Sequence, residues 1–128
     1  PYDVGINENA ARTLEYAYAD FCLWKLAQKL GRTQLEISTF AKRHQNYRNL
    51  LDPETRLMRG RNKSGEFQSP FNPFKWGDAF TEGNSWHYTW SVFHDIEGLA
   101  QLMGGHAAFA AKLDTIFNLP PIFDESYY

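Results

Sequence analysis

The side chains that could do chemistry are concentrated in residues 82–94. This segment holds a glutamate, an asparagine, two histidines, two tryptophans and a tyrosine. Its glutamate, Glu82, lies close in sequence to the rings of Phe80, Trp86 and Tyr88. Burial among such rings favours the protonated form of a carboxyl group, which a general acid requires. We therefore expect Glu82 to be a catalytic acid in an apolar pocket, the alternative being a solvated or helix-capping glutamate.

The neighbouring acids and histidines are expected to be structural. Asp95 can cap a helix, and Glu97 falls in the first turn of that helix, where a negative charge suits the helix dipole. His87 and His94 lie too far apart for one metal-binding helix, which needs histidines about three or four residues apart. The residues therefore predict no histidine metal site.

A cluster of basic residues occupies positions 42–63, just ahead of several aromatic residues. Such a combination occurs on nucleic-acid-binding surfaces. Asp52 and Glu54 dilute the cluster, and a net charge of −2 gives the chain no general attraction to nucleic acid. A salt-bridged surface is the favoured interpretation, and no nucleic-acid partner is expected. The cluster comprises Lys42, Arg43, Arg48, Arg56, Arg59, Arg61 and Lys63.

Length and composition restrict the fold class. A chain of 128 residues suits one domain with a sizeable core. Aromatic residues make up 16% of the chain, and those in loops could either stack on sugar rings or form a small core. The single cysteine, Cys22, lies among Phe21, Leu23 and Trp24, so we expect a buried, inert thiol. No apolar run is long enough to span a membrane.

Hydrophobic periodicity predicts an all-α fold, in which two helical hairpins are joined by a long ordered loop. The helices are expected at about 8–30, 34–50, 95–103 and 106–117, and the loop at about 52–94. The residues expected to face inward are Leu14, Ala17, Phe21 and Trp24, then Ile37, Phe40, Ala41 and Tyr47, then Ile96, Leu99, Ala100 and Met103, and finally Phe109, Ala110, Leu113, Ile116 and Phe117.

Capping and turn signals refine these boundaries. Asn7 or Asn9 is expected to cap the first helix, and Thr33 with Glu36 forms a capping box before the second. A short hairpin is expected around Ser64 and the glycine that follows it. The stretch from 86 to 92 fits either an extended segment or a helical turn.

The motifs of this chain resemble glycoside hydrolase family 92, the calcium-dependent, exo-acting α-mannosidases. The central match is EGNSWHYTW at 82–90, followed by HDIEGL at 94–99 and LMGG at 102–105. Three further runs agree in order and spacing: TLEYAY at 13–18, NYRNL at 46–50 and MRGR at 58–61. The resemblance covers about residues 7–119, which is nearly the whole chain.

The resemblance implies a much larger enzyme. Family members pair a β-sandwich with a catalytic (α/α)6 barrel, and residues 1–128 would be a single segment of that barrel. Its helices would then expose apolar faces that the rest of the catalytic domain covers. The resemblance also implies an exported protein, in the periplasm, at the cell surface or outside the cell. The alternative is a non-catalytic helical module that binds carbohydrate or a protein partner.

The resemblance also implies a reaction, the removal of terminal α-linked mannose from mannosides or N-glycans with inversion. Glu82 matches the family's general acid, whereas the base would follow residue 128, so this chain alone would be inactive. Asn84, Trp86, His87 and Tyr88 are expected to contact substrate, and His87 departs from the glutamine more often found there. Calcium is implied as a cofactor with its ligands mostly outside this segment, and no metal ligand is assigned here.

Overall fold

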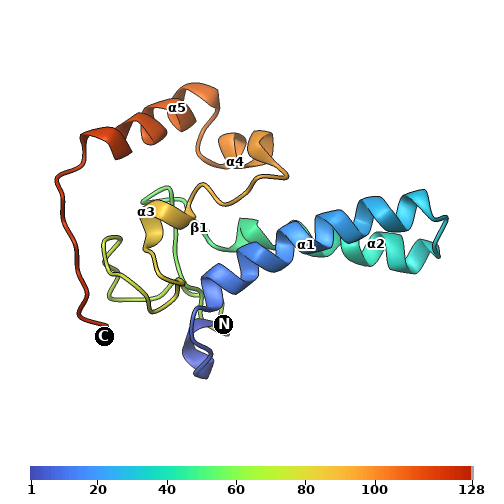
Figure 1. The fold of residues 1–128 in the computed structure, drawn as a ribbon, viewed down its shortest axis with the longest axis horizontal. Helices are drawn as coiled ribbons and strands as arrows, with labels where there is room; N and C mark the ends of the chain where they lie inside the picture. The colour runs from blue at the N-terminus through green and yellow to red at the C-terminus, as the bar shows by residue number, and fades with distance from the viewer. Residues whose placement is uncertain (128) are drawn as a thin grey trace.

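The structure, a computed structural model, describes residues 1–127. It is mostly helical, and its described part contains one two-stranded sheet (Figure 1). In chain order the elements are the 3-10 helix η1 (Tyr2–Val4), α1 (Asn9–Lys29), α2 (Gln34–Arg43), the 3-10 helix η2 (Asn46–Asn49), β1 (Leu51–Asp52), β2 (Leu57–Met58), α3 (Ser85–Tyr88), α4 (Ile96–Leu102), α5 (His106–Thr115) and the 3-10 helix η3 (Ile116–Asn118).

Helices α1 and α2 pack as a hairpin that projects from the rest of the chain (Figure 1). Gly31 reverses the chain between them with a left-handed φ of 61°. The predicted capping box then starts α2. The Thr33 hydroxyl accepts a hydrogen bond from the Glu36 amide, and the Glu36 carboxylate accepts one from the Thr33 amide at 3.0 Å.

The predicted cap at the start of α1 is wrong, since neither Asn7 nor Asn9 fills it. The N-cap residue is Glu8, whose side chain makes no capping hydrogen bond. The side-chain amide of Asn9 instead donates to the Ile6 carbonyl at 3.0 Å. The asparagine therefore stabilises the loop before the helix rather than the first free amides of the helix.

The second predicted helix is shorter than expected, because α2 ends at Arg43 and is followed by η2. Between these elements His44 is buried, and its ring stacks on that of Trp24 with 4.8 Å between centroids. The 3-10 turn then carries Tyr47 into the core, where it is 0% exposed. Tertiary packing of two aromatic rings thus overrides the local preference for a longer helix.

A short antiparallel ladder at the start of the loop is a feature that the sequence analysis missed. β1 pairs with β2, and each strand has only 2 residues, too few for periodicity to reveal. The Asp52 carboxylate holds the turn by accepting hydrogen bonds from Thr55 at 3.0 Å and Arg59 at 2.9 Å. Burial tends to raise the pKa of Asp52, but these bonds and the Glu54 amide outweigh it and lower the pKa.

The loop also contains the hairpin that was predicted around Ser64. The Asn62 amide donates to the Glu66 carbonyl at 2.8 Å, and Gly65 at the turn has a φ of 93°. The positive φ explains why glycine is suited to this position. The loop is therefore ordered by local hydrogen bonds rather than by long strands.

The α4 helix begins at its predicted cap, where the Asp95 carboxylate accepts the Gly98 amide at 3.0 Å. Its predicted inward face is correct at three positions and wrong at Ile96, which is 58% exposed. Ile96 shares the helical face of the other three by spacing, but the residues that cover Leu99, Ala100 and Met103 do not cover it. The three buried positions are Leu99, Ala100 and Met103.

The predicted inward face of α5 is correct at Phe109, which packs against the core and the Trp90 ring, but the helix contains no fully buried residue. Figure 1 shows α5 at the periphery, and Phe117 just after it is 79% exposed. Cys22 on α1 is likewise exposed rather than buried. Both predictions assumed neighbours on more sides than residues 1–127 provide. Other exposed apolar side chains on the first hairpin are Leu23, Leu26, Leu30 and Leu35.

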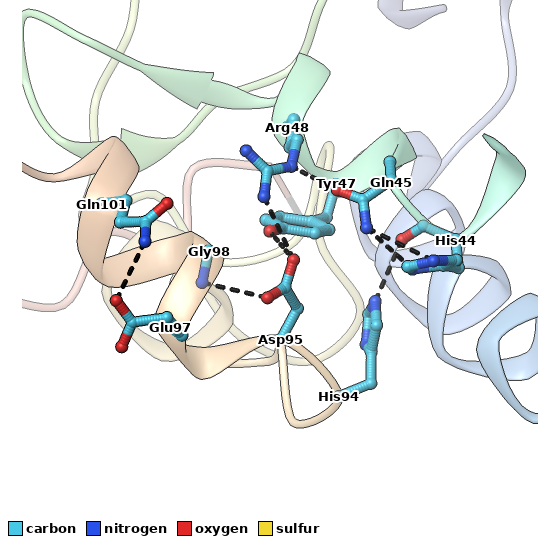
Figure 2. A network of polar contacts seen from close by, with 9 residues as sticks. All are labelled: His44, Gln45, Tyr47, Arg48, His94, Asp95, Glu97, Gly98 and Gln101. Atoms are coloured by element: carbon cyan, nitrogen blue, oxygen red, sulfur yellow. Dashed lines mark hydrogen bonds and ion pairs between the residues drawn. The ribbon is translucent and has the colours of Figure 1, made fainter. Parts of the chain in front are cut away.

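Polar contacts join the two helical hairpins, as Figure 2 shows. The Asp95 carboxylate accepts hydrogen bonds from the Tyr47 hydroxyl at 2.5 Å, from Arg48 at 3.2 Å and from the Gly98 amide at 3.0 Å. We call these four residues the Asp95 clamp. Burial tends to raise the pKa of Asp95, but the three hydrogen bonds outweigh it and lower the pKa.

The hydrophobic core surrounds this clamp and the β1–β2 ladder. It draws on α1, η2, the loop and α4, so the loop is anchored to both hairpins. Its fully buried members contribute most to stability, since burying such a side chain is worth roughly 1.5–3 kcal/mol. They include Leu14, Tyr47, Met58, Val92, Leu99 and Met103.

Candidate functional site

Glu82 lies on an exposed loop just before α3. Its backbone φ of 44° is left-handed, a conformation that costs energy for a residue other than glycine. Within residues 1–127 no hydrogen bond or ion pair engages its carboxylate. The described residues do not form the apolar pocket that was expected around Glu82. The carboxylate is therefore available to a ligand, and any enclosing wall must come from elsewhere.

Asn84 caps α3, so the stretch that the sequence left open begins as a helical turn. Its side-chain oxygen accepts the His87 amide at 3.3 Å and lies 2.8 Å from His87 Nδ1. His87 stands at the third helical position, where glutamate or glutamine completes a capping box. Histidine can take the place of the expected glutamine because its ring nitrogen completes the same capping interaction with Asn84. Asn84 is buried, whereas His87 is exposed.

Two residues that the sequence analysis overlooked attach α3 to the core. The Ser85 hydroxyl donates to the Met58 carbonyl at 2.5 Å, and the Thr89 hydroxyl accepts the Met58 amide at 2.9 Å. The Thr89 hydroxyl also donates to the Ser85 carbonyl at 2.7 Å. Together the two hydroxyls hydrogen-bond the backbone carbonyl and amide of Met58 in β2, as a neighbouring strand would. Their spacing of four residues would have revealed a shared helical face, had the turn been recognised.

Trp86 is only 9% exposed, so it packs inside the segment more than it faces solvent. Its ring lies 6.3 Å from that of Phe74, and the Lys112 ammonium sits over it at 4.4 Å. Burial, and then the charge of Arg56, lowers the pKa of Lys112. The contact docks α5 onto α3, and the indole nitrogen of Trp86 is buried without a hydrogen-bond partner among residues 1–127.

A groove of about 240 Å³ brings three of the predicted substrate-binding residues together. Asn84, Trp86 and His87 line one side of it, and the chain after α5 lines the other. The ring of Trp76 meets His87 edge-on at 5.6 Å, which adds an aromatic border. Its lining is mainly apolar with a few polar groups, as small-molecule sites often are. Its remaining lining residues are Phe74, Ile116, Leu119, Pro120 and Ile122.

Tyr88, the fourth predicted substrate-binding residue, does not line this groove. Its hydroxyl donates to the Thr81 carbonyl at 2.8 Å, and its ring stacks on that of Phe80 with 5.3 Å between centroids. The structure thus brings Asn84, Trp86 and His87 to one surface and places Tyr88 under the loop that carries Glu82.

The family model of the glycosyl hydrolase family 92 catalytic domain matches residues 1–126. The chain belongs to glycoside hydrolase family 92. An uncharacterized secreted glycosidase of Arthroderma benhamiae is 29% identical over 131 residues, which cover 84% of this chain and 17% of that protein.

Solved structures of family 92 enzymes agree with this assignment. An inverting mannosidase of Bacteroides thetaiotaomicron shares 44% sequence identity with a TM-score of 0.84, and the match covers 98% of this chain and 17% of that one. An α-mannosidase of the same organism, in complex with mannoimidazole, shares 36% identity with a TM-score of 0.87, covering 97% and 17%. The chain therefore spans about a sixth of the length of the family 92 proteins that it matches.

The residues present do not fit the calcium ion implied by family 92. Calcium takes about six to eight oxygen ligands, usually including several carboxylates. In the part of the chain that the structure describes, no three His, Cys, Asp or Glu side chains come together in a way that could hold a metal ion. The helices of residues 1–127 also include none that is long and apolar enough to cross a lipid bilayer.

Four of the seven residues of the basic cluster, Arg43, Arg48, Arg59 and Arg61, make internal side-chain contacts within residues 1–127 of this family 92 segment. Arg59 pairs with Asp52 at 2.9 Å and donates to the Gln68 carbonyl at 2.7 Å. Arg43 pairs with the buried Asp20, also at 2.9 Å. These pairs favour the salt-bridged interpretation over a nucleic-acid surface.

Two other titratable groups are shifted by their surroundings. Burial, followed by the hydrogen bond to Asp78, raises the pKa of Tyr2 to about 12. Burial, followed by the neighbouring His94, lowers the pKa of His44. Both side chains have internal partners, so neither competes with Glu82 as a group facing a ligand.

Proposed function

We propose that the full-length protein is an α-mannosidase that removes terminal α-linked mannose from mannosides or N-glycans with inversion of configuration. Glu82 is its general acid. The Glu82 carboxyl gives its proton to the leaving oxygen as the bond from C1 to that oxygen breaks. A base outside this segment takes a proton from the attacking water, and inverting enzymes place the two groups about 6.5–9.5 Å apart. On this proposal the 128-residue chain lacks the base and is inactive by itself.

The observation that carries this proposal is the contrast between Glu82, which has a left-handed backbone in a restrained loop, and the aspartates around that loop. Asp52, Asp78 and Asp95 each form an ion pair with a lysine or arginine. Glu82 is exposed and has no such partner among residues 1–127. A buried carboxylate is normally paired, whereas a general acid must remain free to reach the substrate. The family 92 mannosidase neighbours support the same reaction.

The groove beside α3 supports a division of roles among the predicted substrate-binding residues. We assign direct substrate contact to the exposed His87, and a wall of the site to Trp86. Asn84 acts mainly by capping α3 and by orienting the His87 ring. The replacement of the expected glutamine by His87 would then alter linkage preference.

The proposal also includes export of the protein and dependence of its activity on calcium. The Arthroderma benhamiae relative is described as secreted, which supports an exported protein here as well. Calcium dependence follows from the family resemblance, and its ligands lie mostly outside residues 1–127. The remainder of the catalytic domain then closes the site over Glu82 and covers the exposed apolar faces of α1 and α5.

The reaction is tested on the full-length protein by following an unactivated methyl α-mannoside with proton NMR. We expect β-mannose to appear first, and Glu82→Gln to lower kcat by about 10²–10⁴-fold. Glu54→Gln makes the same change at another exposed loop glutamate and leaves kcat unchanged. Release of α-mannose first would contradict inversion, and an unaffected Glu82→Gln enzyme would contradict the acid. Binding of mannose-containing glycans without any turnover would instead identify a non-catalytic module.

A further inference from the structure

We propose that Tyr88 is a positioning residue that sets the orientation of Glu82, rather than a substrate-binding residue. The inference rests on the proposed role of Glu82 as general acid. Its first support is a hydrogen bond, in which the Tyr88 hydroxyl donates to the Thr81 carbonyl at 2.8 Å. That carbonyl belongs to the peptide group that enters Glu82. Tyr88 therefore acts on the backbone of the acid and leaves its carboxylate free.

The ring of Tyr88 restrains the other side of the same loop. A Cβ atom added at Gly83 would lie 3.1 Å from the ring of Tyr88, so the ring packs directly against the glycine that follows Glu82. The ring of Phe80, which is itself buried, stacks on the Tyr88 ring with 5.3 Å between centroids. The residues on both sides of Glu82 are thus in contact with one side chain.

The loop is closed at its base by a backbone hydrogen bond. The Gly77 amide donates to the Gly83 carbonyl at 2.9 Å. Glu82 therefore lies in a short loop whose ends are fixed, and Tyr88 contacts that loop at Thr81 and Gly83. This arrangement holds Glu82 at its left-handed φ of 44°. Without such restraint a glutamate would relax to a more common backbone conformation and turn its carboxyl away.

Tyr88 can hold the loop because it is itself held by the core. It ends α3, which the hydroxyls of Ser85 and Thr89 attach to β2 through Met58. A continuous series of contacts therefore runs from the buried ladder through α3 to the Tyr88 hydroxyl and the Glu82 peptide. Precise placement of an acid matters because small displacements of a catalytic group are costly.

The test compares two substrates on the full-length enzyme, methyl α-mannoside and 2,4-dinitrophenyl α-mannoside. The first needs a proton from the acid to release its leaving group, and the second does not. We expect Tyr88→Phe to lower kcat/KM about tenfold on the methyl glycoside and to change it less than about twofold on the activated one. The ratio of the two rates is measured on one preparation, so a smaller fraction of folded enzyme does not affect it.

Two further variants make the outcomes distinct. Tyr2→Phe removes another phenol hydrogen bond, to Asp78 in the same loop at 3.0 Å, and should leave the ratio unchanged. Glu82→Gln should change the ratio strongly. If Glu82→Gln changes it and Tyr88→Phe does not, the positioning role is wrong and the general acid stands. If Glu82→Gln does not change it, both proposals are wrong. Equal losses on both substrates for Tyr88→Phe would also overturn the positioning role.

Discussion

Two regions of the molecule use a tyrosine hydroxyl to fix an acidic residue, and they do so in opposite ways. In the Asp95 clamp, the Tyr47 hydroxyl binds the carboxylate itself at 2.5 Å. In the loop before α3, the Tyr88 hydroxyl binds the backbone at Thr81. In the first arrangement the carboxylate is occupied by a structural hydrogen bond. The second fixes the residue in place and keeps its carboxylate for other partners.

The surroundings of the two acids follow the same division. Asp95 receives three hydrogen bonds and joins two helical hairpins, whereas Glu82 receives none from residues 1–127 and is exposed. Charged groups in the interior are normally paired. The difference teaches that an unpaired acid on a well-restrained loop indicates function more strongly than the type of residue alone. Each region can be changed separately, which allows the comparison to be tested.

The largest effect on stability is expected from Gly98→Ala in the clamp. A Cβ at this position would lie closer than 3.0 Å to atoms of Asp95, Tyr47 and Arg48. Overpacking of this kind costs about 1–3 kcal/mol, and the loss of the clamp adds to it. Hydrogen exchange of peptides covering residues 95–103 should show faster local opening in the full-length protein. Gln101→Ala, an exposed change on the same helix, should cost less than about 0.5 kcal/mol.

A smaller effect is expected from Tyr47→Phe, which removes one hydrogen bond to the Asp95 carboxylate. Bonds to charged groups contribute about 1.5–3 kcal/mol. The melting temperature should fall, while the ratio of rates on poor and activated mannosides should stay unchanged. Tyr88→Phe should do the reverse, with little change in melting temperature and a clear change in that ratio. If the two variants behaved alike, the proposed division between the regions would be wrong.

The smallest effect is a pH dependence of the clamp. Since the pKa of Asp95 is lowered in the folded protein, its hydrogen bonds stabilise the fold above the unfolded value of about 3.9. That stability is lost as the pH falls through this value toward the lower folded one. Exchange protection of α4, corrected for intrinsic rates, should therefore decrease below about pH 4. Asp95→Asn should weaken this dependence, and Asp52, Glu36 and Asp124, whose pKa values are lowered as well, contribute to what remains.

Sequence reasoning succeeded where local signals determine structure. The capping box at Thr33 and the cap at Asp95 each depend on residues within three positions, and both are confirmed. The family assignment is confirmed as well, because the EGNSWHYTW motif and its companions lie in a fixed order. The mostly helical fold with two helical hairpins follows from periodicity over long segments.

It failed where the outcome depends on contacts between distant residues. The break after Arg43 results from packing of His44 on Trp24, and the exposure of Cys22 and Phe117 results from missing neighbours. The motif singled out Glu82 as the candidate acid. Its left-handed backbone and the contacts of Tyr88 with its loop depend on tertiary structure, so the sequence could not predict them. The substrate-binding roles of Asn84, Trp86 and His87 remain predictions.

The most direct measurement of the central claim is the dependence of kcat/KM on the acidity of the leaving group, for full-length wild-type and Glu82→Gln enzymes. If Glu82 is the general acid, the wild-type rate changes little across a series of aryl and alkyl α-mannosides. The variant should match it within about tenfold on the most activated member and fall progressively behind as the leaving group becomes poorer. A variant that loses the same factor on every member of the series would contradict the assignment of Glu82 as the acid.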